Sequence, residues 1–248
     1  MHTFDEEQIE NDEEKEKSSD PGLAQKLLES RTILLFGEIN MDVAREITKQ
    51  LLVLDADSDD PIKLYINSPG GHVESGDTIY DMIRFVKSPV KVIGTGWVAS
   101  AGALIYAAAE KENRYSLPNT RFLLHQPMGG ARGQAADIAI EAEEILKMRK
   151  RLNEIFAGQT GQPLDKVEDD TDRNFWMSAK EAQDYGLVGQ IVVSDSDIYT
   201  LLKSILERGR PSGRKHCRQP DGRLFLFKQA IIIQAASYQA QRYRFPAV

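Results

Sequence analysis

Short apolar runs alternate with amphipathic stretches between residues 32 and 193, and this alternation limits the possible folds of the 248-residue chain more than any other feature. The runs are rich in Ile, Leu and Val, which is typical of buried strands, and between them apolar residues recur every three or four positions, as in helices. The expected strands are 32–36, 62–66, 90–93, 114–117, 121–125 and 187–193, and the expected helices are 41–54, 74–86, 101–109, 135–156 and 178–186. Strands that alternate with helices predict an α/β domain over about residues 23–200.

Two of these helices carry further signals. The long one, 135–156, has a charged face and an apolar face that we expect to point inward, made of Ile138, Ala142, Ile145, Leu152 and Phe156. The last one begins with Ser178 and has Glu181 three residues later, which is the pattern of a capping box, and it ends at Gly186.

The two ends of the chain differ in composition from this domain. Residues 1–22 are an acidic run that ends in Pro-Gly, and we expect a disordered tail there. Residues 201–248 are rich in Arg, Gly and Pro and then turn apolar at LFLFKQAIIIQ, which makes them a basic C-terminal extension to which the sequence assigns no role.

Composition excludes several classes of protein. A hydrophobic content of 41% with 28% charged residues is that of an ordinary globular domain, and a net charge of −7 disfavours a nucleic-acid partner. The single cysteine, Cys217, excludes an internal disulfide and suits a reducing compartment, and together with four scattered histidines it offers no metal cluster. We find no apolar run of membrane-spanning length and no targeting pattern in the first 20 residues. We therefore expect a cytoplasmic protein without metal, cofactor or membrane partner.

A serine stands among small residues in the stretch GTGWVASAGA, residues 94–103. Ser100 lies where an expected strand meets an expected helix, and two roles fit that position. Its hydroxyl can cap the helix, as serines often do. Alternatively, the Gly and Ala neighbours allow a substrate carbonyl to approach the hydroxyl, which then acts as a nucleophile.

A nucleophilic serine needs a base and donors for the oxyanion. His2 and His216 lie in the tails and His72 follows the turn SPGG, whereas His125 ends an expected strand, where catalytic groups of α/β proteins gather. The backbone amides of Gly71, in that turn, and Ala101, at the start of the helix, are candidate oxyanion donors.

Two other functions use the same glycine-rich segments. Residues 94–99 fit the G-x-G-x-x-A pattern of a dinucleotide site, although the next expected strand ends in Pro118-Asn119, without the acidic residue that such sites place on the ribose. An acyl-CoA hydratase of the crotonase type would use two amides as an oxyanion hole and a nearby carboxylate, for which Glu74 and Asp77 are the candidates; both also fit the role of helix N-terminal charges.

Five separated motifs in order give the sequence a family resemblance: LYINSPGG, GDTIYDMIRF, ASAGA, HQPMGGARGQAADI and MSAKEAQDYGLV. Over residues 27–193 the chain resembles the ClpP family, the proteolytic subunit of the ATP-dependent Clp protease, a serine peptidase. The resemblance implies a ClpP/crotonase-like α/β fold of repeated β-β-α units with a protruding handle helix, 135–156, that interlocks two stacked heptameric rings. It also implies an AAA+ unfoldase of the Clp type as partner and unfolded proteins and peptides as substrates.

The same resemblance assigns the site. It implies Ser100 as nucleophile, His125 as general base, an oxyanion hole of Gly71 and Ala101, and pairing of substrate backbone with Gly129, Gly130, Ala131 and Arg132.

One position departs from the family pattern. The third triad residue of the family is an aspartate, and alignment on the 178–186 helix places Asn174 there; Asp170 and Asp172 match only in a shifted register. An asparagine orients a histidine but does not stabilise its imidazolium. Two hypotheses follow: a peptidase that is weak alone and gains activity in a ring mixed with a paralogous subunit, or a catalytically impaired structural subunit of such a ring.

Overall fold

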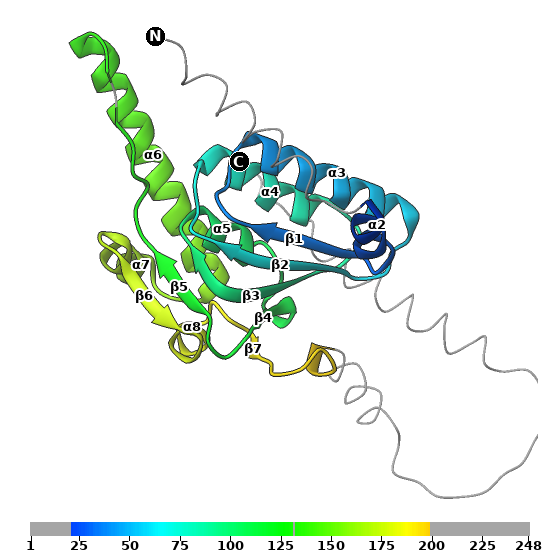
Figure 1. Ribbon diagram of the computed structural model, residues 1–248. Helices are drawn as coiled ribbons and strands as arrows, with labels where there is room; N and C mark the ends of the chain where they lie inside the picture. The colour runs from blue at the N-terminus through cyan, green and yellow to red at the C-terminus, as the bar shows by residue number, and fades with distance from the viewer. Residues whose placement is uncertain (1–20, 131, 199–248) are drawn as a thin grey trace, which may run out of the picture. The chain divides into compact units, whose positions relative to one another are not determined.

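The computed structural model describes residues 21–130 and 132–198 (Figure 1). Residues 1–20, Ala131 and 199–248 lie outside the described part of the chain, so the expected N-terminal tail and C-terminal extension fall almost entirely outside it. The acidic run of the sequence ends in Pro21-Gly22, but a helix, α2 (Pro21–Glu29), already begins at these two residues.

A seven-stranded sheet organises the described residues. Its strands are β1 (Thr32–Phe36), β2 (Ile62–Ser68), β3 (Val90–Ala99), β4 (Arg114–Ser116), β5 (Arg121–Leu124), β6 (Phe175–Ser178) and β7 (Gln190–Ile191). The order is β1-β2-β3-β4-β7, all parallel; β5 pairs in parallel with the far end of β3, and β6 pairs antiparallel with β5. The sheet therefore continues in two directions from β3.

Helices cover one face of this sheet. They are α3 (Met41–Asp57), α4 (Val73–Phe85) and α5 (Ala101–Ala107), which follow β1, β2 and β3, respectively, in the chain. In β2 every second residue is fully buried, because Ile62, Leu64 and Ile66 face these helices. The cluster that they form also includes Leu152 and Phe156 from the next helix, α6 (Ala135–Thr160), so the end of α6 completes the core.

The expectation for α6 is partly wrong. Leu152 and Phe156 are buried and Ile145 is half-buried, but Ile138 and Ala142 are exposed. Figure 1 shows the reason: the start of α6 projects beyond the other helices and strands, so none of these elements covers Ile138 or Ala142. An apolar face at helical spacing predicts burial, and here the rest of the chain does not supply the covering surface.

Strand β3 is longer than expected and changes the interpretation of residues 94–99. The sequence predicts a strand that ends at residue 93, whereas β3 runs to Ala99, and Gly94 pairs with both Ile66 and Ser116. The glycines at 94 and 96 therefore lie in a strand and form no phosphate-binding turn ahead of a helix, which removes the structural basis for a dinucleotide site.

Four smaller elements complete the described residues besides β6. A short 3₁₀ turn, η1 (Lys111–Asn113), precedes β4, and α7 (Leu164–Thr171) precedes β6; neither of these two elements nor β6 is among those expected from the sequence. Helix α8 (Ala179–Tyr185) has the expected capping box between Ser178 and Glu181 and ends at Gly186 in the left-handed conformation. The expected strand over 187–193 is reduced to β7, which has two residues.

Candidate active site

Ser100 occupies an unusual backbone position between β3 and α5. Its φ is 55° and its ψ −123°, and Arg31 is the other non-glycine residue with positive φ among those that the structure describes. Such a conformation costs about 1–3 kcal/mol and persists where the surroundings enforce it. The surroundings here are backbone hydrogen bonds: Ser100 N–H donates to Leu123 O over 3.0 Å, and Ser100 O accepts from Ala103 N over 2.9 Å.

The hydroxyl of Ser100 does not cap α5. No side-chain hydrogen bond joins it to the first turn of that helix, whereas Ser178, at the equivalent position of α8, accepts from Glu181 N. The simpler of the two roles expected for Ser100 is therefore wrong. Its side chain is half-buried and makes no hydrogen bond to the residues that the structure describes.

The SPGG turn packs directly against Ser100. Gly70 has φ +100°, and a Cβ atom there would lie 2.5 Å from Ser100 Cβ and 3.1 Å from Ala101 N. Gly71 has φ +144°, and its Cβ would lie 2.2 Å from Ile39 O. Both positions require glycine, because any side chain would collide with backbone or with the serine.

Two backbone amides remain unpaired beside this contact. Ile39 N–H donates to Gly70 O and His72 N–H donates to Ile39 O, both over 2.8 Å, so these bonds hold the turn but use neither the Gly71 nor the Ala101 amide. Ala101 is the first residue of α5, where N–H groups have no intrahelical acceptor. Within the described residues, neither amide donates to a backbone or side-chain acceptor, which is the condition for an oxyanion hole.

A substitution at Gly70 tests how tightly the turn and the serine are fitted. We expect Gly70→Ala to lower the free energy of unfolding by about 2 kcal/mol or more, because it adds a clash to a positive φ. The measurement is urea unfolding followed by circular dichroism. Gly158→Ala is the matched control: a Cβ atom at Gly158, inside α6, would have no other atom within 4 Å, so this change should stabilise by up to about 1 kcal/mol. Equal effects of the two substitutions on the free energy of unfolding would contradict the close packing of Gly70 against Ser100.

His125 follows the last residue of β5 and lies close to Ser100 in the sheet. Ala99 pairs with Leu123, so the serine and the histidine each lie just beyond the paired ends of neighbouring strands. Burial lowers the pKa of His125 below its ordinary value, and a hydrogen bond with the backbone of Gln126 partly opposes this effect. The ring is therefore neutral near pH 7, as a general base must be. In this structure no hydrogen bond joins the ring to the Ser100 hydroxyl.

His125 directly follows β5, and Asn174 directly precedes β6, the strand paired with β5. Strands β5 and β6 are antiparallel with Leu124 opposite Phe175, so the next pair in register is His125 and Asn174. Asn174 is exposed, and its side chain has no hydrogen bond to a described residue. The sequence alignment puts Asn174 at the third triad position, and the register is compatible with it.

The two alternative carboxylates are bound elsewhere. Asp170 accepts from Lys166 Nζ over 2.6 Å and from Tyr185 Oη over 2.8 Å. Asp172 accepts from Arg149 Nη2 over 3.1 Å. A shifted register that brought either carboxylate to His125 would break these bonds.

The expected substrate-binding segment has no regular secondary structure. Gly129, Gly130 and Arg132 are exposed, and Ala131 lies outside the described residues. The segment connects β5 to the start of α6. Exposed, unpaired backbone is what β-addition of a peptide requires, so its pairing with substrate stays a prediction.

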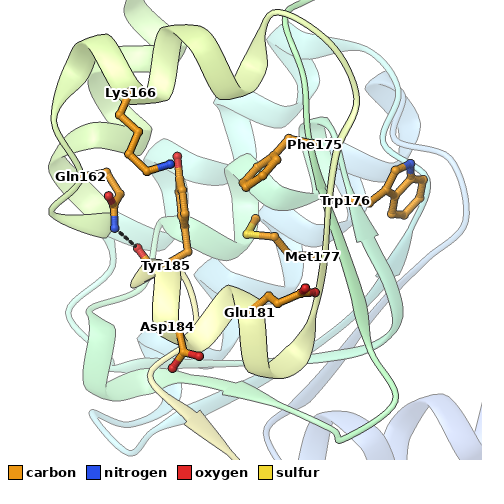
Figure 2. A pocket seen from close by; sticks show the side chains of 8 residues that line it. All are labelled: Gln162, Lys166, Phe175, Trp176, Met177, Glu181, Asp184 and Tyr185. Atoms are coloured by element: carbon orange, nitrogen blue, oxygen red, sulfur yellow. Dashed lines mark hydrogen bonds between the residues drawn. The ribbon is translucent and has the colours of Figure 1, made fainter.

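A separate pocket of about 350 Å³ lies beside β6, α7 and α8 (Figure 2). Its lining comes from β6, α7, α8 and the chain before α7: Gln162, Lys166, Phe175, Trp176, Met177, Glu181, Asp184 and Tyr185. Burial and the hydrogen bond to Asp170 raise the pKa of Tyr185 well above its ordinary value, so this phenol stays protonated. The pocket contains neither Ser100 nor His125.

Neither a metal site nor a membrane-spanning helix is found in residues 21–130 and 132–198. These residues contain no group of three or more His, Cys, Asp or Glu side chains placed to bind a metal ion. None of their helices has the length and apolar character needed to cross a membrane.

Comparisons with known proteins connect this geometry to a family. Residues 14–195 match the model of the Clp protease family. "ATP-dependent Clp protease proteolytic subunit 3" of Rhizobium johnstonii is 62% identical over 172 residues, which cover 69% of this chain and 89% of the relative. "ATP-dependent Clp protease proteolytic subunit 2" of Gluconobacter oxydans is 64% identical over 175 residues, which cover 70% of this chain and 78% of the relative.

Solved structures agree with these relatives. An Asn-to-Asp mutant of ClpP1 from Listeria monocytogenes superposes with a TM-score of 0.67 at 55% identity, over 71% of this chain and 99% of that one. The family resemblance and the ClpP fold expected from the five motifs are thereby confirmed. This chain therefore belongs to the Clp protease family, a family of serine peptidases.

Proposed function

We propose that this Clp proteolytic subunit cleaves peptide bonds with Ser100 as nucleophile, His125 as general base, and Gly71 and Ala101 as oxyanion donors. The observation that carries the proposal is the strained backbone of Ser100, whose hydroxyl does not cap α5 and whose Cβ packs against Gly70 of the SPGG turn. Strain at a residue with a free nucleophile is typical of a catalytic position.

The proposed reaction follows acyl transfer to serine. Ser100 Oγ attacks the carbonyl carbon while His125 accepts the proton, and the amides of Gly71 and Ala101 stabilise the negative oxygen of the tetrahedral intermediate. His125 then donates the proton to the leaving amine. A water molecule, activated by the same histidine, hydrolyses the acyl-enzyme and regenerates Ser100.

The direct test is covalent labelling. A fluorophosphonate should modify the full-length chain at a single serine, and mass spectrometry of the digested product should locate the adduct on Ser100. Labelling at another residue, or none either alone or beside a paralogous subunit, would assign the chain the role of a structural subunit.

The pH dependence of peptide hydrolysis tests His125. Because burial lowers the pKa of His125, the ring loses its proton at a lower pH than an ordinary histidine, whose pKa is about 6.5. We expect kcat/KM to fall as the pH drops through this lowered pKa, so the acid limb should have its midpoint below about pH 6.5. A midpoint above about 7 would contradict the assignment.

The proposal extends to assembly and partners. The exposed apolar residues on the projecting half of α6, Ile138, Ile140 and Leu146, support contact between two rings, each a heptamer, in a tetradecamer. Gly129 to Arg132 would bind substrate backbone. An AAA+ unfoldase of the Clp type would feed unfolded proteins to the enclosed sites, in the cytoplasm, and the rings would be homo-oligomeric or mixed with a paralogous subunit. Sedimentation of the purified chain with and without a paralogue distinguishes these last two arrangements.

A further inference from the structure

The two tryptophans of the chain lie together, and neither is among the residues assigned to catalysis. The rings of Trp97, in β3, and Trp176, in β6, are stacked with their centroids 6.4 Å apart and an angle of 4° between planes. The guanidinium carbon of Arg121, in β5, lies 4.4 Å from the centroid of the Trp176 ring. Trp97 is 43% exposed and Trp176 36% exposed, although both are large and apolar. We call these three residues the tryptophan platform.

Strand register places the platform on the same face of the sheet as the candidate catalytic residues. Arg121 pairs with Trp97 on one side, and Leu123 pairs with Trp176 on the other. Side chains of paired residues project from the same face, and every second residue along a strand shares that face. His125 therefore shares the face of Arg121, and Asn174 that of Trp176.

The opposite face of the same strands is closed by the core. Phe122 and Leu124 are fully buried there, and Met177 is 3% exposed. Figure 2 shows the indole of Trp176 on the other side of β6 from Phe175 and Met177. The platform therefore lies on the face of β5 and β6 that the candidate catalytic residues share.

Arg121 carries a charge that the described part of the chain does not neutralise. Among those residues no carboxylate lies within 4.0 Å of its guanidinium, whereas two other exposed cations, Lys166 and Lys180, are paired. A guanidinium held over a tryptophan ring keeps its N–H donors in a fixed plane, suited to a carboxylate. Tryptophan and arginine are also the residues most enriched where proteins bind their ligands tightly.

We propose that the tryptophan platform is a substrate subsite that binds an acidic side chain, Asp or Glu, of the peptide being cleaved. The proposal deepens the function proposed above and rests on it for the nature of the ligand. Strands rise about 3.3 Å per residue, so Leu123, opposite Trp176, lies about 7 Å from His125 along β5 and Arg121 about 13 Å. An extended peptide has a similar rise, so the acidic residue lies about two to four residues from the cleaved bond.

Intrinsic fluorescence tests this directly, because both tryptophans of the chain are in the platform. The full-length Ser100→Ala variant is titrated with tryptophan-free peptides that differ by Glu or Gln at one position, about two to four residues from the central bond. We expect a saturable change in emission and roughly fivefold tighter binding of one of the Glu peptides, the most that an exposed ion pair usually gives.

Substitutions at Arg121 test whether its charge causes the preference for the Glu peptide. Arg121→Gln should abolish the preference for Glu over Gln, and Arg121→Glu should transfer it to the matching Lys peptide. Lys180→Gln, an exposed cation of α8 paired with Asp184, is the matched control and should leave the preference unchanged. Equal binding of Glu and Gln peptides, or a preference that survives Arg121→Gln, overturns the proposal. So does a change in sedimentation caused by Arg121→Gln, which would assign the platform to contact between copies.

The outcome is independent of the assignment of Ser100. Peptide preference with no fluorophosphonate labelling would leave the subsite standing and remove the nucleophile. Labelling of Ser100 without a preference for the Glu peptide would support Ser100 as the nucleophile and overturn the subsite.

Discussion

Ser100→Ala should abolish peptide hydrolysis without lowering stability. If the hydroxyl forms the acyl-enzyme, its removal should reduce kcat for a short fluorogenic peptide by at least about 10³-fold. The unfolding midpoint should stay unchanged, because the hydroxyl makes no capping hydrogen bond and alanine has the same backbone cost at a φ of 55°. The assay is run on the chain alone and beside a paralogous subunit, so that an activity dependent on a mixed ring is also measured.

Ser178→Ala is the matched control, since Ser178 also stands at the start of a helix. Its side chain does accept from Glu181 N and takes part in a capping box. This substitution should lower the free energy of unfolding by about 1 kcal/mol and leave hydrolysis intact. The two serines thus separate capping from catalysis. Full activity of Ser100→Ala, or equal loss of stability in both variants, would contradict the nucleophile assignment.

Asn174→Asp should increase hydrolysis. In a serine protease the replacement of the triad aspartate by asparagine costs about 10⁴-fold in kcat, because the neutral amide does not stabilise the imidazolium and favours the wrong tautomer. The register of β5 and β6 points to Asn174 as the residue opposite His125. A carboxylate at position 174 should therefore raise the rate of hydrolysis by at least about tenfold and at most about 10⁴-fold. The measurement is kcat/KM for a fluorogenic peptide at neutral pH.

Asp172→Asn separates this explanation from a shifted register. Asp172 is close to Asn174 in the chain and bound to Arg149. If Asn174 holds the third position, Asp172→Asn should change hydrolysis little, and Asn174→Asp should act as expected. If Asp172 moves to His125 in the assembled ring, its substitution should abolish hydrolysis and Asn174→Asp should give no gain.

The sequence was sufficient for most elements because their signals are local. The Ile-, Leu- and Val-rich runs became β1 and β2, and the Ser178–Glu181 capping box fixed the start of α8. The sequence failed where a signal was short or depended on distant partners. Strand β6 consists of the four residues FWMS, and a run this short does not reveal a strand period in the sequence. Its alternation of exposed and buried side chains becomes visible only in the structure. The exposed Ile138 in α6 shows the opposite error, since periodicity predicts an apolar face but not what covers it.

The tryptophan platform shows the same dependence on distant partners. Trp97 and Trp176 are far apart in the chain, and only the pairing of β3 with β5 and of β5 with β6 brings them together. Neither tryptophan lies in a strand expected from the sequence, so no local pattern pointed to their contact.

The order of residues by itself determined the α/β class, the family and the candidates Ser100 and His125, because each depends on composition, spacing or short motifs. Tertiary structure alone decided that the Ser100 hydroxyl does not cap α5, that Gly70 must lack a side chain, and that Trp97 and Trp176 lie together. Backbone angles, close approaches and strand register depend on contacts between segments that are far apart in the chain. Local sequence patterns do not specify those contacts.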